Sequence, residues 1–146
     1  MENNHALINE IVQSFQNSFN TYIQDVRFQY NQKIELNNIN DFPKINFYLT
    51  NIKTGIVLNL EYRFEYLVFF RIKNINNNCF RFDSYLTFKG YEKENLLSLY
   101  YLDGKDIPEK FKTYCDYVVR ILNTDLKNVV EGKEWIDLPN DWMGYK

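Results

Sequence analysis

The sequence is poor in the residues that most enzyme and metal sites need. Its one histidine is His5, so a Ser-His-Asp triad or a Cys-His pair would depend on that residue. A zinc site needs clustered cysteine and histidine ligands, whereas Cys79 and Cys115 lie far apart. The five glycines are isolated, which excludes a glycine-rich phosphate loop. The sequence therefore predicts no catalytic residues, no metal site and no cofactor.

Long apolar runs and secretion signals are also missing. The longest apolar run, residues 66–70, is too short for a membrane helix, and no basic segment followed by an apolar one resembles a signal peptide. The two cysteines do not make a disulfide framework, and we expect them to be buried thiols, Cys79 less clearly than Cys115. Lysine and arginine are scattered in a chain of net charge −2. We therefore expect a cytoplasmic protein that contacts neither membranes nor nucleic acids.

What the sequence has in quantity is aromatic and apolar residues, 18% and 45% of 146 positions, which is enough for the core of one domain spanning residues 1–146. The most regular segment is 56–72, where every even-numbered residue is apolar or aromatic. Alternation of this kind indicates a β-strand with one buried and one solvated face.

Segment 56–72 has two interpretations. Residues 60–73 contain no glycine, proline, asparagine or aspartate for a tight turn, which favours one long bent strand. The alternative is two strands joined by a three-residue or bulged loop, because such a loop also leaves the even positions on one face.

Two helices are expected. Apolar residues at helical spacing predict the first over residues 4–27. The second begins at Asp106, which with Glu109 forms a capping box, and ends at Gly132. Residues 133–146 form an aromatic tail that we expect to pack on the domain.

Further strands are expected at 45–50, 79–88 and 96–102, with a weak strand at 33–36 and a turn at 51–55. The predicted fold class is α+β. An N-terminal helix precedes an antiparallel meander of four to six strands with one long bent strand, and a C-terminal helix follows. Since each helix has one apolar stripe, both should cover the same face of the sheet.

The other face of the sheet is the candidate contact surface. Its expected residues are Glu61, Arg63, Glu65, Phe69, Arg71, Arg81, Asp83 and Tyr85. The charged residues among them are expected to form a solvated ladder of ion pairs between strands. Leu67 and Phe69 interrupt this polar face and suit the centre of a protein interface. Alternatively, Trp135 or Trp142 of the tail covers them.

The size, the order helix, meander, helix, and the closing segment 126–135 (LKNVVEGKEW) resemble the small immunity proteins that accompany bacterial polymorphic toxins. This resemblance implies an inhibitor without chemistry of its own that binds one cognate toxin protein and neutralises it.

Two other hypotheses remain open. One is a small-molecule-binding or hydrolytic domain with an aromatic pocket in the curved sheet, lined by Tyr62, Tyr66 and Phe82. The other is a structural module that forms a homodimer.

Overall fold

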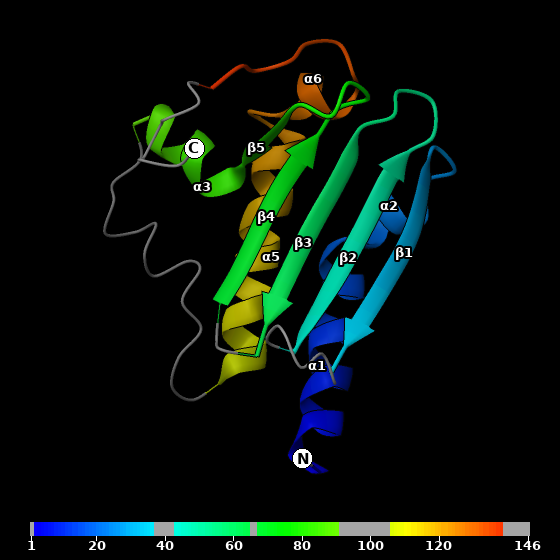
Figure 1. Cartoon of the computed structure of the whole chain (residues 1–146), viewed down its shortest axis with the longest axis vertical. Coiled ribbons are helices and arrows are strands. Elements are labelled where there is room, and N and C mark those ends of the chain that lie inside the picture. The colour runs from blue at the N-terminus through cyan, green and yellow to red at the C-terminus, as the bar shows by residue number, and fades with distance from the viewer. Residues whose placement is uncertain (1, 37–42, 65–66, 91–105, 139–146) are drawn as a thin grey trace.

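The computed structural model describes residues 2–36, 43–64, 67–90 and 106–138, and in these ranges five antiparallel strands form one sheet in meander order (Figure 1). The strands are β1 (Phe28–Glu35), β2 (Lys44–Asn51), β3 (Val57–Arg63), β4 (Leu67–Lys73) and β5 (Cys79–Arg81). The helices are α1 (Glu2–Ser18), α2 (Asn20–Ile23), α3 (Phe82–Phe88), α5 (Ile107–Asn123) and α6 (Lys127–Val130).

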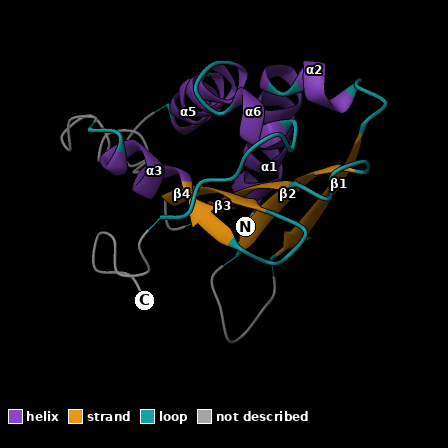
Figure 2. Cartoon of the chain, turned by 90° about the horizontal axis from the view of Figure 1, so that it is seen from above, coloured by secondary structure: helices purple, strands orange, loops and turns teal. Residues whose placement is uncertain are grey.

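Both long helices, α1 and α5, lie side by side on one face of the sheet, as Figure 2 shows from above. The α+β class, the meander and the shared helical face are therefore confirmed. We call the face that α1 and α5 cover the inner face and the opposite one the outer face.

The long bent strand is wrong. Residues 56–72 contain the hairpin β3–β4, in which Leu60 pairs with Phe70 and Tyr62 with Val68. Three residues separate the paired Arg63 and Leu67, so even positions face even positions and the alternation is the same as in a single strand. Phe64 extends the ladder between β2 and β3 by one residue, because its backbone N–H donates to the Pro43 carbonyl at 3.0 Å, and the three connecting residues 64–66 include no glycine.

The first helix ends earlier than predicted. It is interrupted at Phe19, continues as the short α2, and gives way to β1 at Phe28, so the weak strand expected at 33–36 is the end of a longer one. The chain turns where the Asp25 carboxylate accepts a hydrogen bond from the Arg27 backbone N–H at 2.9 Å. From Phe28 onward all eight residues of β1 pair with β2.

The strand predicted at 79–88 is correct only for its first three residues, and α3 follows from Phe82. Phe82 and Leu86 share a face in a strand as well as in a helix. In the helix, however, Tyr85 joins them in the core while Phe88 is 47% exposed. Burying Tyr85 with its neighbours therefore favours the helix.

The second helix begins and stops where predicted but is split into α5 and α6 by a turn at residues 124–126. Asp106 occupies the N-cap position in a left-handed conformation without a side-chain capping bond, so the expected capping box is wrong. Gly132 ends α6 with φ +76°, a conformation that favours glycine. The strand predicted at 96–102 lies outside the described residues.

Aromatic rings join the two layers of the core. Phe15 of α1 stacks on Phe47 of β2 with ring centroids 4.1 Å apart, and Phe111 of α5 packs on Tyr62 of β3 at 5.7 Å. All four side chains are buried. The two long helices therefore pack on the inner face of the sheet and do not cover the outer face.

Part of the tail packs on the domain, but on the inner side of the sheet. The Trp135 ring meets Phe80 edge-to-face at 5.2 Å, and Phe80 shares its face of β5 with the buried Ile72 of β4. This contact lies on the face opposite to Leu67 and Phe69, which contradicts the alternative that Trp135 covers them. Trp142 lies outside the described residues.

Candidate functional site

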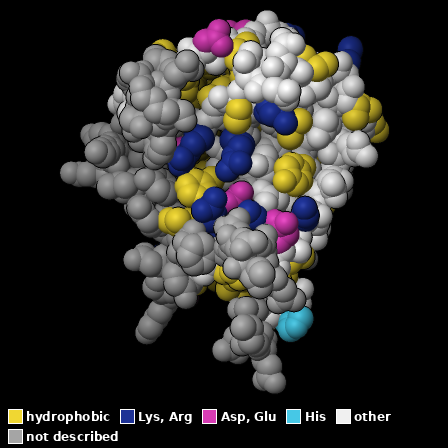
Figure 3. Space-filling view, in the orientation of Figure 1, with side chains coloured by type: hydrophobic (Ala, Val, Ile, Leu, Met, Phe, Trp, Pro, Cys, Tyr) yellow, Lys and Arg dark blue, Asp and Glu magenta, His cyan; other side chains and the backbone are white. Residues whose placement is uncertain are grey.

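The outer face of the sheet brings together side chains from four strands. Strand register places them in rows: Asn46 of β2 lies opposite Glu61 of β3, Glu61 opposite Phe69 of β4, and Arg71 of β4 opposite Arg81 of β5. Figure 3 views this face directly and shows basic, acidic and apolar side chains interspersed across it (Figure 3).

Glu61 lies at the centre of the outer face and is buried, its side chain being only 7% exposed. Arg63 Nε donates a hydrogen bond to Glu61 Oε2, and Arg71 Nη2 lies 3.7 Å from Glu61 Oε1. The prediction that Glu61 belongs to a solvated ladder is therefore wrong. The two arginines are about one third exposed, at 32% and 36%, so they cover the carboxylate and present their own charges to solvent.

Phe69 is held by two of the arginines. Its ring centroid lies 5.1 Å from the Arg63 guanidinium carbon and 4.8 Å from that of Arg81. Both distances are within the range of cation–π attraction. Since Phe69 remains partly exposed, it is an apolar spot with a fixed orientation inside a charged ring.

Arg81 is fixed from the other side by Asp83, in the first turn of α3. Its Nε and Nη2 donate to the two carboxylate oxygens at 3.0 and 3.1 Å. A bidentate pair of this kind sets the plane of the guanidinium as well as its position. The junction between β5 and α3 thereby orients Arg81 against Phe69.

A pair of buried asparagines supports the same face. Asn59 Nδ2 donates to Asn46 Oδ1 and to the Phe47 carbonyl, both at 3.1 Å. Sequence reasoning missed Asn46 and Asn59, since a polar residue at an outward-facing position gives no sign of burial. The one available signal was their alternation with core residues, which places both asparagines on the outer face but does not indicate that they are buried.

Six of the eight predicted contact residues thus belong to this site: Glu61, Arg63, Phe69, Arg71, Arg81 and Asp83. Glu65 lies outside the described residues. Tyr85 was predicted wrongly, because it is 2% exposed on the inner side of α3.

Among the described residues of the outer face, cations outnumber carboxylates although the chain is acidic. The described cations of this face are Lys33, Lys44, Arg63, Arg71, Lys73 and Arg81, and its carboxylates are Glu35, Glu61 and Asp83. These six cations face three carboxylates, so the described part of the outer face carries an excess of positive charge.

His5 and Cys115 lie away from this cluster, whereas Cys79 lies opposite Lys73 on the outer face. Cys115 is buried in α5, where burial raises the pKa of its thiol well above the usual value, and His5 is exposed on α1. Cys79 is exposed on β5, so the expectation of a buried thiol holds for Cys115 alone. In the described part of the chain no three metal-ligating side chains cluster.

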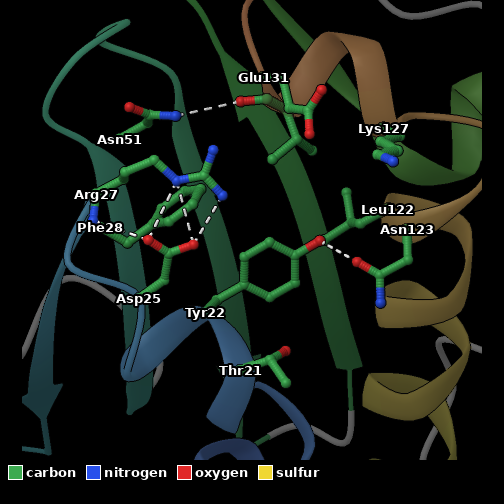
Figure 4. Close-up of a pocket in the computed structure, with 11 residues that line it drawn as sticks. Thr21, Tyr22, Asp25, Arg27, Phe28, Asn51, Leu122, Asn123, Lys127 and Glu131 are labelled. Carbon is green, nitrogen blue, oxygen red and sulfur yellow. Dashed lines mark hydrogen bonds and ion pairs between the residues drawn. The ribbon is translucent and has the colours of Figure 1, made fainter.

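A hollow of about 300 Å³ lies away from the outer face, between α2, the start of β1, and the junction of α5 with α6 (Figure 4). Tyr22 donates to Asn123 Oδ1 at 2.6 Å, and Arg27 pairs with Asp25 at 2.8 Å. Burial, with the charge of Glu131 as a smaller cause, raises the pKa of Tyr22 to about 12.

This hollow is not the aromatic pocket that the sequence suggested. Tyr62 and Phe82 fill the core, at 0% and 1% exposure, and Tyr66 lies outside the described residues. The predicted lining is therefore wrong for the two described residues.

Comparisons with protein-family models, curated proteins and solved structures gave no match to this chain. No helix among the described residues is both long and apolar enough to cross a membrane.

Proposed function

We propose that the chain is a non-catalytic protein-binding module of the immunity type, which binds and neutralises a cognate bacterial toxin in the cytoplasm. The observation that carries this proposal is the outer face itself. There, Phe69 is held between Arg63 and Arg81 on the side of the sheet that α1 and α5 leave uncovered.

The arrangement has the features of a binding hot spot. An aromatic ring that is already held in place loses little conformational freedom when a partner covers it. Arginine and aromatic side chains dominate the energy of many interfaces, and the polar groups around them exclude competing partners. Phe69, Arg71 and Arg81 combine these residue types within one cross-strand cluster.

The carboxylates of the site favour binding over hydrolysis. A catalytic acid and base need carboxyl groups free to exchange protons with a substrate. Glu61 is engaged by Arg63, and both oxygens of Asp83 accept hydrogen bonds from Arg81. These carboxylates orient the arginines.

The test is a double variant, Phe69→Ala with Arg71→Ala. A tagged chain captures its partner from the cells that produce it, and affinity for the purified partner is then measured. We expect a loss of about 100-fold or more, since hot-spot residues contribute roughly 2 kcal/mol or more each. The melting temperature should fall by only a few degrees, because Phe69 is partly exposed and the contact of Arg71 with Glu61 contributes at most about 1 kcal/mol.

The matched control is Phe88→Ala with Arg120→Ala, which removes the same two residue types from exposed positions on α3 and α5. The control should bind like the original chain. Equal affinity of the Phe69, Arg71 double variant and the control would contradict the proposed surface.

Immunity requires one further result. Expression of the captured partner in a bacterial host should stop growth, and co-expression of the original chain should restore it, whereas the Phe69, Arg71 double variant should fail to do so. If the partner binds but does not harm the host, the chain is still a protein-binding module, but the proposed immunity role is wrong.

A second candidate function, small-molecule binding, is favoured by the hollow at Tyr22. Phe28 and Leu122 give it apolar lining, while Arg27 and Lys127 supply charge. A ligand held there should raise the melting temperature in a thermal-shift screen, and Leu122→Trp should abolish that rise by filling the space. A screen without any stabilising compound would remove this candidate.

A further inference from the structure

Arg71 and Arg81 form an unusual cross-strand pair. They lie directly opposite each other on the outer face, where β4 pairs with the edge strand β5. Like charges in directly opposed positions destabilise a sheet. A bound anion between or beside the two guanidinium groups would relieve this repulsion.

The two arginines differ in how well they are already neutralised. Arg81 forms its bidentate pair with Asp83. Within the described ranges, Arg71 has one ion pair, its 3.7 Å approach to Glu61, which is too long for a hydrogen bond. The Arg71 guanidinium therefore keeps donor capacity on an exposed side of the sheet.

We propose that this site recognises a carboxylate-bearing, acidic surface of a protein partner. An aspartate or glutamate of the partner binds Arg71, with Arg81 beside it, while an apolar neighbour covers Phe69. This inference rests on the proposed function and adds the chemistry of the partner. The excess of cations on the outer face would also accelerate association with such a partner.

Charge also argues against two other occupants. A second copy of the chain would bring one cation-rich outer face against another, which is unfavourable. A nucleic acid is best bound by cations along its phosphate backbone, whereas here Glu35, Glu61 and Asp83 interrupt the cations.

The first test uses defined probes and the full chain. The sequence has five arginines, whose Nε–Hε signals are followed by NMR during titration with hexaglutamate, hexalysine or oligothymidylate. Hexaglutamate should shift the Arg71 and Arg81 signals, with a dissociation constant of about 1 mM, and leave Arg27 and Arg120 unmoved. Arg71→Gln and Arg81→Gln assign the two signals.

Three outcomes would overturn the inference: no shift of Arg71 with hexaglutamate, equal shifts of all arginines, or tighter binding of oligothymidylate, which would indicate a nucleic acid. Concentration-dependent sedimentation that Arg71→Glu abolishes would indicate that a second copy of the chain occupies the outer face, and it would also overturn the inference.

The second test uses the captured partner. Arg71→Gln should weaken binding roughly ten-fold, through faster dissociation together with a slower association rate that depends less on salt, whereas Arg120→Gln should bind like the original chain. If the Phe69, Arg71 double variant fails to bind but Arg71→Gln and added salt have no effect, the carboxylate inference fails and the proposed function stands. If the double variant still binds, the proposed function itself fails.

Discussion

Replacing Glu61 by glutamine should destabilise the fold, although the change is isosteric. The carboxylate accepts a hydrogen bond from Arg63 and lies 3.7 Å from Arg71. A hydrogen bond to a charged group contributes about 1.5–3 kcal/mol, and the longer, partly exposed contact adds at most about 1 kcal/mol. Because Arg63 is one third exposed, we expect a loss of about 2 kcal/mol in the free energy of unfolding.

The measurement is urea unfolding followed by circular dichroism, in which the midpoint should fall while the slope stays constant. The melting temperature should fall by about 4–8 °C. Glu35→Gln is the matched control, since Glu35 is 26% exposed and lies 3.4 and 4.0 Å from two lysines at the end of the same face. It should change stability by less than about 0.5 kcal/mol. Equal effects of the two substitutions would refute the idea that Glu61 organises the arginines.

Two further substitutions test the inner layers. Burial raises the Tyr22 pKa to about 12 in the folded chain against about 10 when unfolded, so its stabilisation is complete below pH 10 and is lost between pH 10 and 12. Tyr22→Phe should therefore reduce the alkaline loss of stability by up to about 3 kcal/mol in unfolding titrations, and an unchanged pH profile would contradict this burial. Gly132→Ala should destabilise the chain by about 1–3 kcal/mol more than Gly90→Ala in thermal denaturation. Both positions have positive φ, but the added carbon lies 2.7 Å from Thr54 at Gly132 and meets nothing within 4 Å at Gly90. Equal losses would show that Thr54 moves aside.

Alternation in the sequence predicted which face each strand residue occupies but not where a strand ends. Leu60 and Phe70 lie on the inner face whether residues 56–72 form one strand or a three-residue hairpin. The deciding contacts are the backbone pairs between β3 and β4, such as Glu61 with Phe69, and alternation alone does not predict them. Phe82 and Leu86 were similarly ambiguous, because residues four apart share a face in a strand and in a helix. The burial of Tyr85 distinguishes the two and favours the helix.

The candidate site was predictable as a set of outward-facing residues, since alternation assigns each strand residue to one face of the sheet. Its internal order was not predictable. The burial of Glu61 depends on the positions of the Arg63 and Arg71 guanidinium groups. The cation–π contact of Arg81 with Phe69 depends on the pairing of β4 with β5. Asp83 enters the site because α3 begins directly after β5, which the sequence did not indicate.

The most direct test of the account is an arginine footprint of the chain bound to its captured partner. Phenylglyoxal modifies accessible guanidinium groups, and mass spectrometry measures the protection of each of the five arginines. The account predicts strong protection of Arg71 and Arg81 on the outer face, with Arg27 and Arg120 as reactive as in the free chain. Protection of Arg27 or Arg120, with Arg71 still reactive, would place the partner on another surface and contradict the account.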